Sequence, residues 1–268
     1  MKFLNGAELA GFIKERQAKQ VRALRQAYGV YPKLAIITTS ENPTIDIYIK
    51  LKKAYGEDIL IDVDVYRIKQ TDAKQQIIKL NNDPSVHGII VQLPLENPAQ
   101  TDEILQAVDP QKDVDGLGLK PLYDLATPTA INWLLTGYNI SMESQNIVII
   151  GKGRLVGAPL YDMWRQSSYQ VTALDVEDEI APHLKHATVI VSATGQPNLL
   201  TSTLIPVGAV VVDAGTSVEN GTQKGDLADD VYERDDLTVT PRKGGVGPLT
   251  VAALFENVIR AARSTIST

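Results

Sequence analysis

The sequence predicts an α/β protein of two domains, each built on a parallel sheet with helices on its faces. Short apolar runs alternate with segments of helical periodicity along most of the chain, and such alternation produces parallel strands joined by right-handed crossovers. Glycine follows several of these runs, at the strand ends where ligands of open α/β sheets bind. A length of 268 residues suits two modest domains or one large α/β unit.

The N-terminal half is expected to begin with a helix and to continue with three strands. Residues 9–24 place apolar side chains at helical spacings, and Gly29 ends this amphipathic pattern. The apolar runs predict strands at 34–37, 59–65 and 88–93. Helical patterns at about 45–55 and 72–80 stand between them. The order is therefore strand, helix, strand, helix, strand.

A second set of strands follows the loop 113–118, where we place a domain boundary. A predicted helix at 128–135 leads into strands at 147–150, 170–174, 188–192, 209–213 and, more briefly, 237–240. The last segment, 249–263, has the apolar face of a helix. We expect one domain made of residues 1–118 and 249–268, and a second made of residues 119–248.

The composition excludes several classes of function. With 26 basic and 32 acidic side chains the net charge is −6, so no global positive field attracts nucleic acid or anionic lipid. The absence of cysteine excludes disulfides, zinc–thiolate sites, iron–sulfur ligation and a cysteine nucleophile. His183 and His186 have a metal-like spacing without a third ligand, so we interpret them as surface residues and expect no metal. The chain lacks a signal-peptide pattern and a membrane-length apolar stretch, which favours a cytoplasmic location.

The strand at 147–150 runs directly into a glycine-rich turn that a helix follows. The spacing G-x-G-x-x-x-G is one residue longer than the dinucleotide fingerprint, and the alternative is a tight turn that binds nothing. Glycines would let the backbone approach a pyrophosphate at the helix N-terminus. The residues expected to contact a dinucleotide are Gly151, Lys152, Gly153, Arg154, Val156 and Gly157, together with Thr194, Gly195 and Gly215 after later strands.

An acidic loop after the next strand favours NAD over NADP. Asp175 stands at about the 20-residue offset from the glycine turn where an acid accepts hydrogen bonds from the adenine-ribose hydroxyls. Glu177 and Asp178 would repel a 2′-phosphate, and Lys152 is the opposing charge. The alternative for Glu177 and Asp178 is a solvated acidic loop.

Four polar residues of the N-terminal half are expected to face one crevice. Tyr48 and Lys52 are four residues apart and share one face of a helix. Gln92 lies at the carboxyl end of a strand, and Asp115 lies in the loop that leaves the domain. Each residue taken singly is unremarkable, because a helix lysine is usually solvated and a strand-end glutamine usually bonds to backbone.

Five segments in order give these residues a family context. They are Tyr48-x-x-x-Lys52, Val91-Gln92-Leu93-Pro94-Leu95, Lys112-Asp113-Val114-Asp115-Gly116, Thr127-Pro128 and Gly244-Gly245-Val246-Gly247-Pro248-Leu249-Thr250. Over nearly the whole chain the sequence resembles the bifunctional methylenetetrahydrofolate dehydrogenase/methenyltetrahydrofolate cyclohydrolase family. The resemblance implies an N-terminal catalytic domain, a Rossmann-type nucleotide-binding domain with folate bound between the two, a last helix that packs back on the first domain, and a homodimer.

The resemblance also implies the chemistry. Members oxidise 5,10-methylenetetrahydrofolate with NAD or NADP and usually hydrolyse the methenyl product to 10-formyltetrahydrofolate, within one-carbon metabolism and purine biosynthesis. Lys52 would be the catalytic lysine and Gln92 would tune it by a hydrogen bond, while Tyr48 would border the folate and Asp115 would bind the pterin. Further folate contacts would come from Leu93, Gly244, Gly245 and Pro248.

The sequence departs from the family pattern at positions near the expected site. Ile45 replaces a usual serine and Ala126 replaces a usual cysteine, which suggests weakened cyclohydrolase activity as a hypothesis. The turn 151–153 replaces Gly-Arg-Ser, and Val176 and Glu177 replace basic or hydroxyl residues. One alternative is a monofunctional NAD-dependent dehydrogenase of the same family. Another is a degraded paralogue that only binds folate or nucleotide, against which the presence of all four polar residues argues.

Overall fold

The structure is a computed structural model that describes residues 1–175, 177–219 and 222–267. Its helices are α1 (Gly6–Tyr28), α2 (Pro43–Ile59), α3 (Ala73–Asn81), α4 (Thr101–Leu105), α5 (Ala126–Gly137), α6 (Gly157–Gln166), α7 (Ile180–Leu184) and α8 (Val246–Ser264). Its strands are β1 (Lys2–Phe3), β2 (Lys33–Thr38), β3 (Asp62–Arg67), β4 (Gly88–Val91), β5 (Ile147–Ile150), β6 (Val171–Leu174), β7 (Val189–Ser192), β8 (Val210–Asp213), β9 (Ser217–Glu219), β10 (Thr222–Lys224) and β11 (Thr238–Val239).

The chain divides into two compact units. The three-stranded unit comprises residues 11–126 and the chain from Val251 on, and the six-stranded unit comprises residues 1–10 and 127–250. The six-stranded unit includes the first ten residues, which we expected in the other domain, because β1 pairs in parallel with β11. A strand of two residues is too short to produce a recognisable sequence pattern, so β1 could not be predicted from the sequence.

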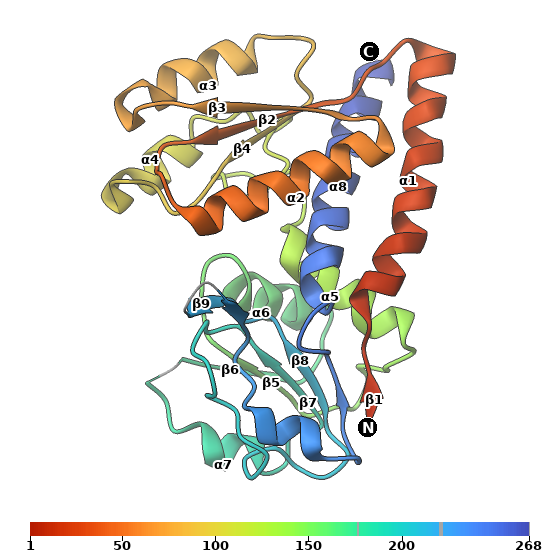
Figure 1. Ribbon diagram of the computed structural model, residues 1–268, viewed down its shortest axis with the longest axis vertical. Coiled ribbons are helices and arrows are strands. Elements are labelled where there is room, and N and C mark those ends of the chain that lie inside the picture. The colour runs from red at the N-terminus through yellow and green to blue at the C-terminus, as the bar shows by residue number, and fades with distance from the viewer. Residues whose placement is uncertain (176, 220–221, 268) are drawn as a thin grey trace. The chain divides into compact units, whose positions relative to one another are not determined.

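The three-stranded unit has a parallel sheet in the order β3-β2-β4, as the alternating pattern predicted. Helices α2 and α3 lie on opposite faces of this sheet (Figure 1). Ala35 and Ile37 of β2 pack in one buried cluster with Ile77 of α3. Helix α8 belongs to this unit from Val251 on, and the ring of Phe255 stacks on that of Tyr55 at 5.0 Å between centroids, which confirms the expected return of the last helix.

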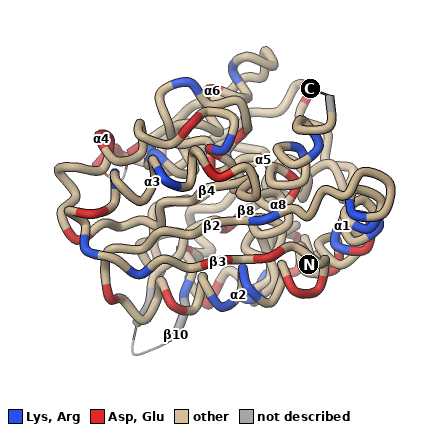
Figure 2. The backbone as a smooth tube through the Cα atoms, turned by 90° about the horizontal axis from the view of Figure 1, so that it is seen from above, with Lys and Arg blue, Asp and Glu red and all other residues tan. Residues whose placement is uncertain are grey.

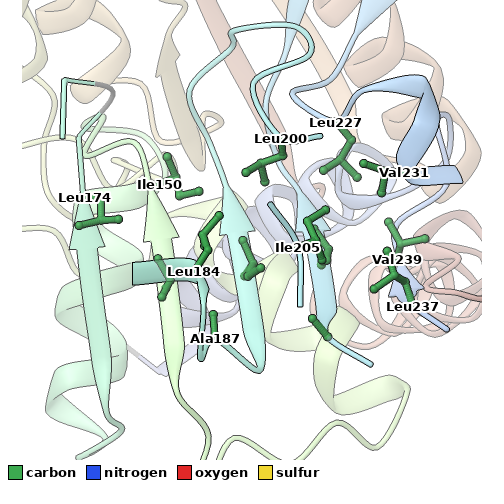
Figure 3. Close-up of a cluster of buried hydrophobic side chains, with 14 residues drawn as sticks. Ile150, Leu174, Leu184, Ala187, Leu200, Ile205, Leu227, Val231, Leu237 and Val239 are labelled. Carbon is green, nitrogen blue, oxygen red and sulfur yellow. The ribbon is translucent and has the colours of Figure 1, made fainter. Parts of the chain in front are cut away.

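The six-stranded unit has a parallel sheet in the order β1-β11-β8-β7-β5-β6. Strands β5 and β7 are buried along their whole length, as continuous apolar runs in a doubly covered sheet should be. Figure 3 shows part of its core, a buried cluster that includes Ile150 of β5, Leu174 of the neighbouring β6, and Leu200 and Leu227 from loops after later strands. The predicted fold class, two α/β domains with parallel sheets, is confirmed.

Helix α2, which carries the first candidate residues, is longer than the periodicity indicated. The side chain of Asn42 caps its start by accepting a hydrogen bond from the backbone N–H of Thr44 at 2.9 Å, and Pro43 occupies the first turn. The helix continues to Ile59 and ends at Leu60 in the left-handed conformation. Strand β3 therefore begins at Asp62, three residues after the start that we expected.

Charges of both signs are distributed over the described residues. Figure 2 shows basic and acidic positions interspersed on α1 and α2, and some pair, such as Lys14 with Asp58 at 2.6 Å. Within the described part of the chain no helix is both long and apolar enough to cross a bilayer. His183 and His186 are both exposed, as expected for surface residues.

Candidate active site

The structure brings Lys52 and Gln92 into direct contact in the three-stranded unit. The Nζ atom of Lys52 donates a hydrogen bond to Oε1 of Gln92 at 2.9 Å. Gln92 follows β4 directly, and its backbone N–H donates to the carbonyl of Ile37 in the neighbouring strand at 2.8 Å. Its amide nitrogen donates to the carbonyl of Leu93 at 3.1 Å, which fixes the amide so that its oxygen faces the lysine.

The pKa values of Lys52 and Asp115 both change in the direction that favours the uncharged side chain. Burial lowers the pKa of Lys52, and the attraction of the Asp115 carboxylate opposes this shift. Burial raises the pKa of Asp115, with Lys52 acting against the rise and Asp113 adding to it. A lowered pKa makes the lysine amine easier to deprotonate, so this lysine can exchange a proton more readily than an ordinary surface lysine.

The loop that carries Asp115 is shaped by the residue two positions before it. The buried carboxylate of Asp113 accepts hydrogen bonds from the backbone N–H groups of Gly116 at 3.1 Å and Gly118 at 2.7 Å. Gly116 has a φ of 70°, and a Cβ there would lie 2.6 Å from the carbonyl oxygen of Tyr123. The sequence motif contained Asp113, but our interpretation gave it no role. It builds the turn that presents Asp115.

Tyr48 lies one helical turn before Lys52 on α2 and is half-buried. The two departures from the family pattern are apolar and enclosed, since the exposed fraction of Ile45 is 2% and that of Ala126 is 7%. Neither side chain can hold a water molecule by a hydrogen bond.

The glycine turn forms in the six-stranded unit as the sequence indicated, between β5 and α6. Gly151 has a φ of 95°, and a Cβ on it would lie 2.6 Å from the carbonyl oxygen of Ala193. A Cβ on Gly157 would overlap the carbonyl of Gly151, so the start of α6 is pressed directly against the turn. Lys152, Arg154 and Val156 lie in the turn between these contacts.

The acidic loop after β6 is tied to the glycine turn through Asp178. Its Oδ2 atom accepts a hydrogen bond from the backbone N–H of Asp175 at 2.7 Å and lies 3.7 Å from Nζ of Lys152. The N–H of Asp175 and the charge of Lys152 hold the pKa of the Asp178 carboxyl below its usual value. Asp175 and Glu177 are exposed, and Val176 lies outside the described residues.

The other predicted cofactor contacts, Thr194, Gly195 and Gly215, follow the ends of β7 and β8. Two carboxylates that our sequence interpretation did not single out hold Thr194 and Gly215. Thr194 donates to Asp226 from its N–H at 2.8 Å and from its hydroxyl at 2.9 Å. Gly215 donates its N–H to Asp213 at 3.0 Å. An aspartate at the carboxyl end of an apolar strand, as at position 213, was the signal that could have identified one of them.

The glycines predicted to contact folate, Gly244 and Gly245, also belong to the six-stranded unit. Gly244 has a φ of 83°, and its carbonyl accepts a hydrogen bond from the N–H of Ala7 at 2.8 Å. Pro248 lies in the first turn of α8. The described residues contain no group of three His, Cys, Asp or Glu side chains that could hold a metal ion.

A glycine turn between a strand and a helix, at the carboxyl edge of a parallel sheet, is typical of the dinucleotide-binding α/β domains. Comparison with known proteins narrows this class. Residues 4–115 match the family model described as the catalytic domain of tetrahydrofolate dehydrogenase/cyclohydrolase, and residues 125–266 match that of its NAD(P)-binding domain. The chain belongs to this family, as its motifs predicted.

Individual relatives are similar to this chain over nearly their whole length. The bifunctional protein FolD of Staphylococcus epidermidis is 35% identical, over 97% of this chain and 96% of the relative. The structure of the bifunctional FolD methylenetetrahydrofolate dehydrogenase/cyclohydrolase of Campylobacter jejuni has a TM-score of 0.92 at 32% identity, covering 99% of each chain. A 5,10-methylenetetrahydrofolate dehydrogenase of the silkworm Bombyx mori has a TM-score of 0.90 at 27% identity, covering 100% of each chain. The chain is therefore an enzyme of the methylenetetrahydrofolate dehydrogenase/cyclohydrolase type that uses a nicotinamide cofactor.

Proposed function

We propose that this enzyme oxidises 5,10-methylenetetrahydrofolate with NAD⁺ in preference to NADP⁺ and hydrolyses the methenyl product to 10-formyltetrahydrofolate. The observation that carries the hydrolytic step is the hydrogen bond of 2.9 Å between Lys52 and Gln92 beside Asp115. The observation that carries the cofactor preference is the placement of Asp178 between Lys152 and the backbone of Asp175.

The glycine turn suits the pyrophosphate of a dinucleotide. A Cβ added to Gly153 would meet no atom within 4 Å, so the turn leaves open space at this position. The N-terminal end of α6 adds the partial positive charge of the helix dipole. Gly151, Gly153 and the first turn of α6 would hold the pyrophosphate, and Thr194, Gly195 and Gly215 would contact the rest of the dinucleotide. The bound nicotinamide supplies the hydride acceptor, so the side chains have only to orient it and the folate.

The cofactor preference follows from how the charges of the loop are arranged. A 2′-phosphate needs a cation, and Lys152 is the basic residue that the structure shows beside the acidic loop. Because Asp178 lies 3.7 Å from its Nζ atom, part of that positive charge is already neutralised by the chain itself. Asp175 would then accept hydrogen bonds from the ribose hydroxyls of NAD⁺, while its charge and that of Glu177 would repel a 2′-phosphate.

Kinetic assays with both nucleotides test this preference. With saturating methylenetetrahydrofolate, kcat/KM for NAD⁺ should exceed that for NADP⁺ by about tenfold or more, because a carboxylate that bonds the ribose hydroxyls contributes about 1.5–3 kcal/mol. Formation of reduced nucleotide is followed at 340 nm on the purified enzyme. A kcat/KM that favours NADP⁺ would refute the role given to Asp175.

The hydrolytic step uses the residues of the three-stranded unit. Water attacks the methenyl carbon of the folate, and Lys52 takes up and returns a proton through its Nζ atom as the ring opens. Gln92 directs that nitrogen by accepting one of its hydrogen bonds, without the charge that would raise the lysine pKa. Tyr48 would border the folate, Asp115 would bind the amino and ring nitrogens of the pterin, and Leu93 would complete this side of the pocket.

Replacing Lys52 tests this assignment. Lys52→Met should lower the rate of methenyl hydrolysis by about 100-fold or more, the usual contribution of a general acid–base group, while sparing part of the hydride transfer. Loss of the methenyl absorbance reports hydrolysis, corrected for the spontaneous rate. Lys53→Met makes the same substitution at the neighbouring exposed lysine of α2 and should leave both activities unchanged. Equal hydrolysis by wild type and Lys52→Met would remove Lys52 from its role.

The second candidate function is that of a dehydrogenase with weak or lost cyclohydrolase activity. The buried, apolar Ile45 and Ala126 favour it, because polar groups usually occupy these positions in the family and could orient the hydrolytic water. In that case 10-formyltetrahydrofolate would accumulate no faster than by spontaneous hydrolysis, even in the wild-type enzyme. A paralogue that only binds folate or nucleotide would show no absorbance change at 340 nm with either nucleotide. By resemblance to the family we further propose a cytoplasmic homodimer that serves purine biosynthesis.

A further inference from the structure

Asp226 is a fully buried carboxylate in the six-stranded unit that the proposed chemistry does not use. Its Oδ2 atom accepts three hydrogen bonds, from the hydroxyl of Ser192 at 2.6 Å and from the N–H and hydroxyl of Thr194 at 2.8 and 2.9 Å. Burying a carboxylate is costly unless its partners compensate, and an apolar residue would fill the same volume at lower cost. The geometry of its partners therefore indicates what this carboxylate does.

The second oxygen of Asp226 lies against the other predicted cofactor loop. Its Oδ1 atom has no hydrogen-bond partner among the described residues, and a Cβ on Gly215 would overlap it. Only glycine lets the backbone of position 215 pass so close to the carboxylate. Asp226 thus holds the loop after β7 by hydrogen bonds and the loop after β8 by close packing.

Asp213 completes the arrangement from the end of β8. Its Oδ1 atom accepts a hydrogen bond from the N–H of Gly215 at 3.0 Å, and its Oδ2 atom accepts from the N–H groups of Asp226 at 2.9 Å and Leu227 at 3.1 Å. Burial and the like charge of Asp226 raise the pKa of Asp213 to about 6, with the backbone N–H groups acting against the rise. Asp213 therefore fixes the backbone of Asp226 while it holds Gly215.

The segment that carries Asp226 is itself firmly anchored. The N–H of Leu200 donates to the carbonyl of Asp226 at 3.1 Å, and the N–H of Ala228 donates to the carbonyl of Leu200 at 2.9 Å. The side chains of Leu200 and Leu227 lie close together in the buried cluster shown in Figure 3. A carboxylate on such a support can impose a position on the loops that it contacts.

The positions of these loops matter because they lie at the strand ends that face the glycine turn. Ser192 and Asp213 are paired residues at the carboxyl ends of β7 and β8, the edge where parallel sheets bind ligands. A Cβ on Gly151 would lie 3.1 Å from the Cγ2 methyl of Thr194, so the Thr194 loop also packs against the glycine turn. A shift of Thr194 would therefore disturb two groups of predicted cofactor contacts together.

We propose that Asp226, fixed by Asp213, is a positioning residue that sets the affinity for the nicotinamide dinucleotide by holding Thr194 and Gly215 at the strand ends. This inference rests on the proposed placement of the dinucleotide at Thr194, Gly195 and Gly215. Asp226 acts through the loops and does not contact the cofactor, because its exposed fraction is 0%. The free energy of binding then depends on how well the loops are preorganised.

Dinucleotide binding measured apart from catalysis tests the proposal. Asp226→Ala should raise the dissociation constant of NADH, measured by its fluorescence, by about tenfold or more, because a hydrogen-bonded charged group is lost from beneath the loops. Asp226→Asn keeps an acceptor oxygen for Ser192 and Thr194 and should restore most of the affinity, to within about threefold of the wild type. Methenyl hydrolysis needs no nucleotide, and Lys52, Gln92 and Asp115 belong to the other unit, so both variants should retain it.

Asp230 provides the matched control. Its Oδ2 atom accepts hydrogen bonds from the N–H and hydroxyl of Ser202 at 3.1 and 2.7 Å, and its Oδ1 atom is buried and without a partner, as in Asp226. Asp230→Ala removes the same types of bond from the same unit without touching Thr194 or Gly215. It should lower the unfolding temperature but leave the NADH dissociation constant unchanged.

Two further results make the outcome decisive. If Asp226→Ala fails to fold, Ser192→Ala provides a milder variant, because it removes only one hydroxyl group that donates to the carboxylate. It should weaken NADH binding by about two- to fivefold. A wild-type enzyme that binds neither NADH nor NADPH would overturn the proposed cofactor site. The positioning role alone would be overturned if the wild type binds NADH and the Asp226→Ala and Ser192→Ala variants bind it equally well. The same holds if these variants raise the NADH dissociation constant no more than Asp230→Ala does.

Discussion

The chemistry that we propose for Lys52 depends on its partner being an amide rather than a carboxylate. A carboxylate at the position of Gln92 would raise the lysine pKa and hold the amine in its charged form. The Oε1 atom of Gln92, at 2.9 Å, directs the same nitrogen without that charge, and burial is the main influence on the lysine pKa. The attraction of Asp115 is the opposing effect, so the balance between burial and one carboxylate decides how basic Lys52 is.

The ion pair between Asp178 and Lys152 should affect the choice between NAD⁺ and NADP⁺. Asp178→Asn should lower the ratio of kcat/KM for NAD⁺ to that for NADP⁺ by about two- to fivefold, the range expected for an exposed ion pair. The physical reason is that Lys152 loses its carboxylate partner at 3.7 Å and becomes available to a 2′-phosphate. The ratio is measured with both nucleotides at low and high salt, and the difference should shrink as salt screens the charges.

A substitution at Glu177 distinguishes the effect of the Lys152–Asp178 ion pair from the effect of the net charge of the loop. Glu177→Gln removes the same charge from an exposed neighbour, while Lys152 and the N–H of Asp175 keep their contacts with Asp178. It should move the ratio less than Asp178→Asn does. Equal effects of the two substitutions would show that only the net charge of the loop matters and that the pairing of Lys152 with Asp178 contributes nothing.

At the scale of elements, helix α8 holds the loop that presents Asp115. The buried Asn257 donates from Nδ2 to the carbonyls of Val114 and Asp124, each at 2.9 Å. One amide thus satisfies two backbone acceptors, one inside the Asp113 turn and one after it, and it ties the last helix to a loop more than a hundred residues earlier in the chain. The element that completes the fold therefore also supports the substrate side of the site.

The Asn257 amide should contribute both to stability and to methenyl hydrolysis. Asn257→Ala should lower the free energy of unfolding by about 2–4 kcal/mol, because two buried carbonyls lose their donor. It should also slow methenyl hydrolysis, since Asp115 directly follows Val114. Arg263→Ala, at an exposed position in the last turn of the same helix, should change stability by no more than about 0.5 kcal/mol. Chemical denaturation and the hydrolysis assay check both, and unchanged hydrolysis in a destabilised Asn257→Ala would refute the link to Asp115.

At the scale of the whole molecule, the candidate residues for the two reactions are divided between the two units. Lys52, Gln92 and Asp115 belong to the three-stranded unit, whereas the glycine turn and the carboxylates beneath the cofactor loops belong to the six-stranded unit. The substitutions Lys52→Met and Asp226→Ala should therefore damage different activities, hydrolysis in the first case and nucleotide binding in the second. The net charge of −6 is compatible with this division, because local groups rather than a global field would hold each anionic ligand.

Much of the architecture could be predicted from the sequence because the signals are local. Apolar runs such as 147–150, the glycines that follow them and the four-residue spacing of Tyr48 and Lys52 each report on a few consecutive residues. Position 45 shows where such signals fail: the apolar pattern indicated a helix start there, but the cap at Asn42 and the proline after it begin the helix earlier. The pairing of β1 with β11 joins residues more than two hundred positions apart, and no local pattern could reveal it.

The sequence by itself determined the α/β class, the order of the elements, the family and the polar residues to which we assign the chemistry. The tertiary structure contains the hydrogen bond between Lys52 and Gln92 that the family resemblance implied. It alone decided that Asp178 pairs with Lys152 and that Asp226 lies beneath Thr194 and Gly215. The physical reason is that pKa values and hydrogen bonds depend on burial and on atoms within a few ångströms. Folding brings together residues from different strands and loops, whereas the sequence specifies only which residues are available.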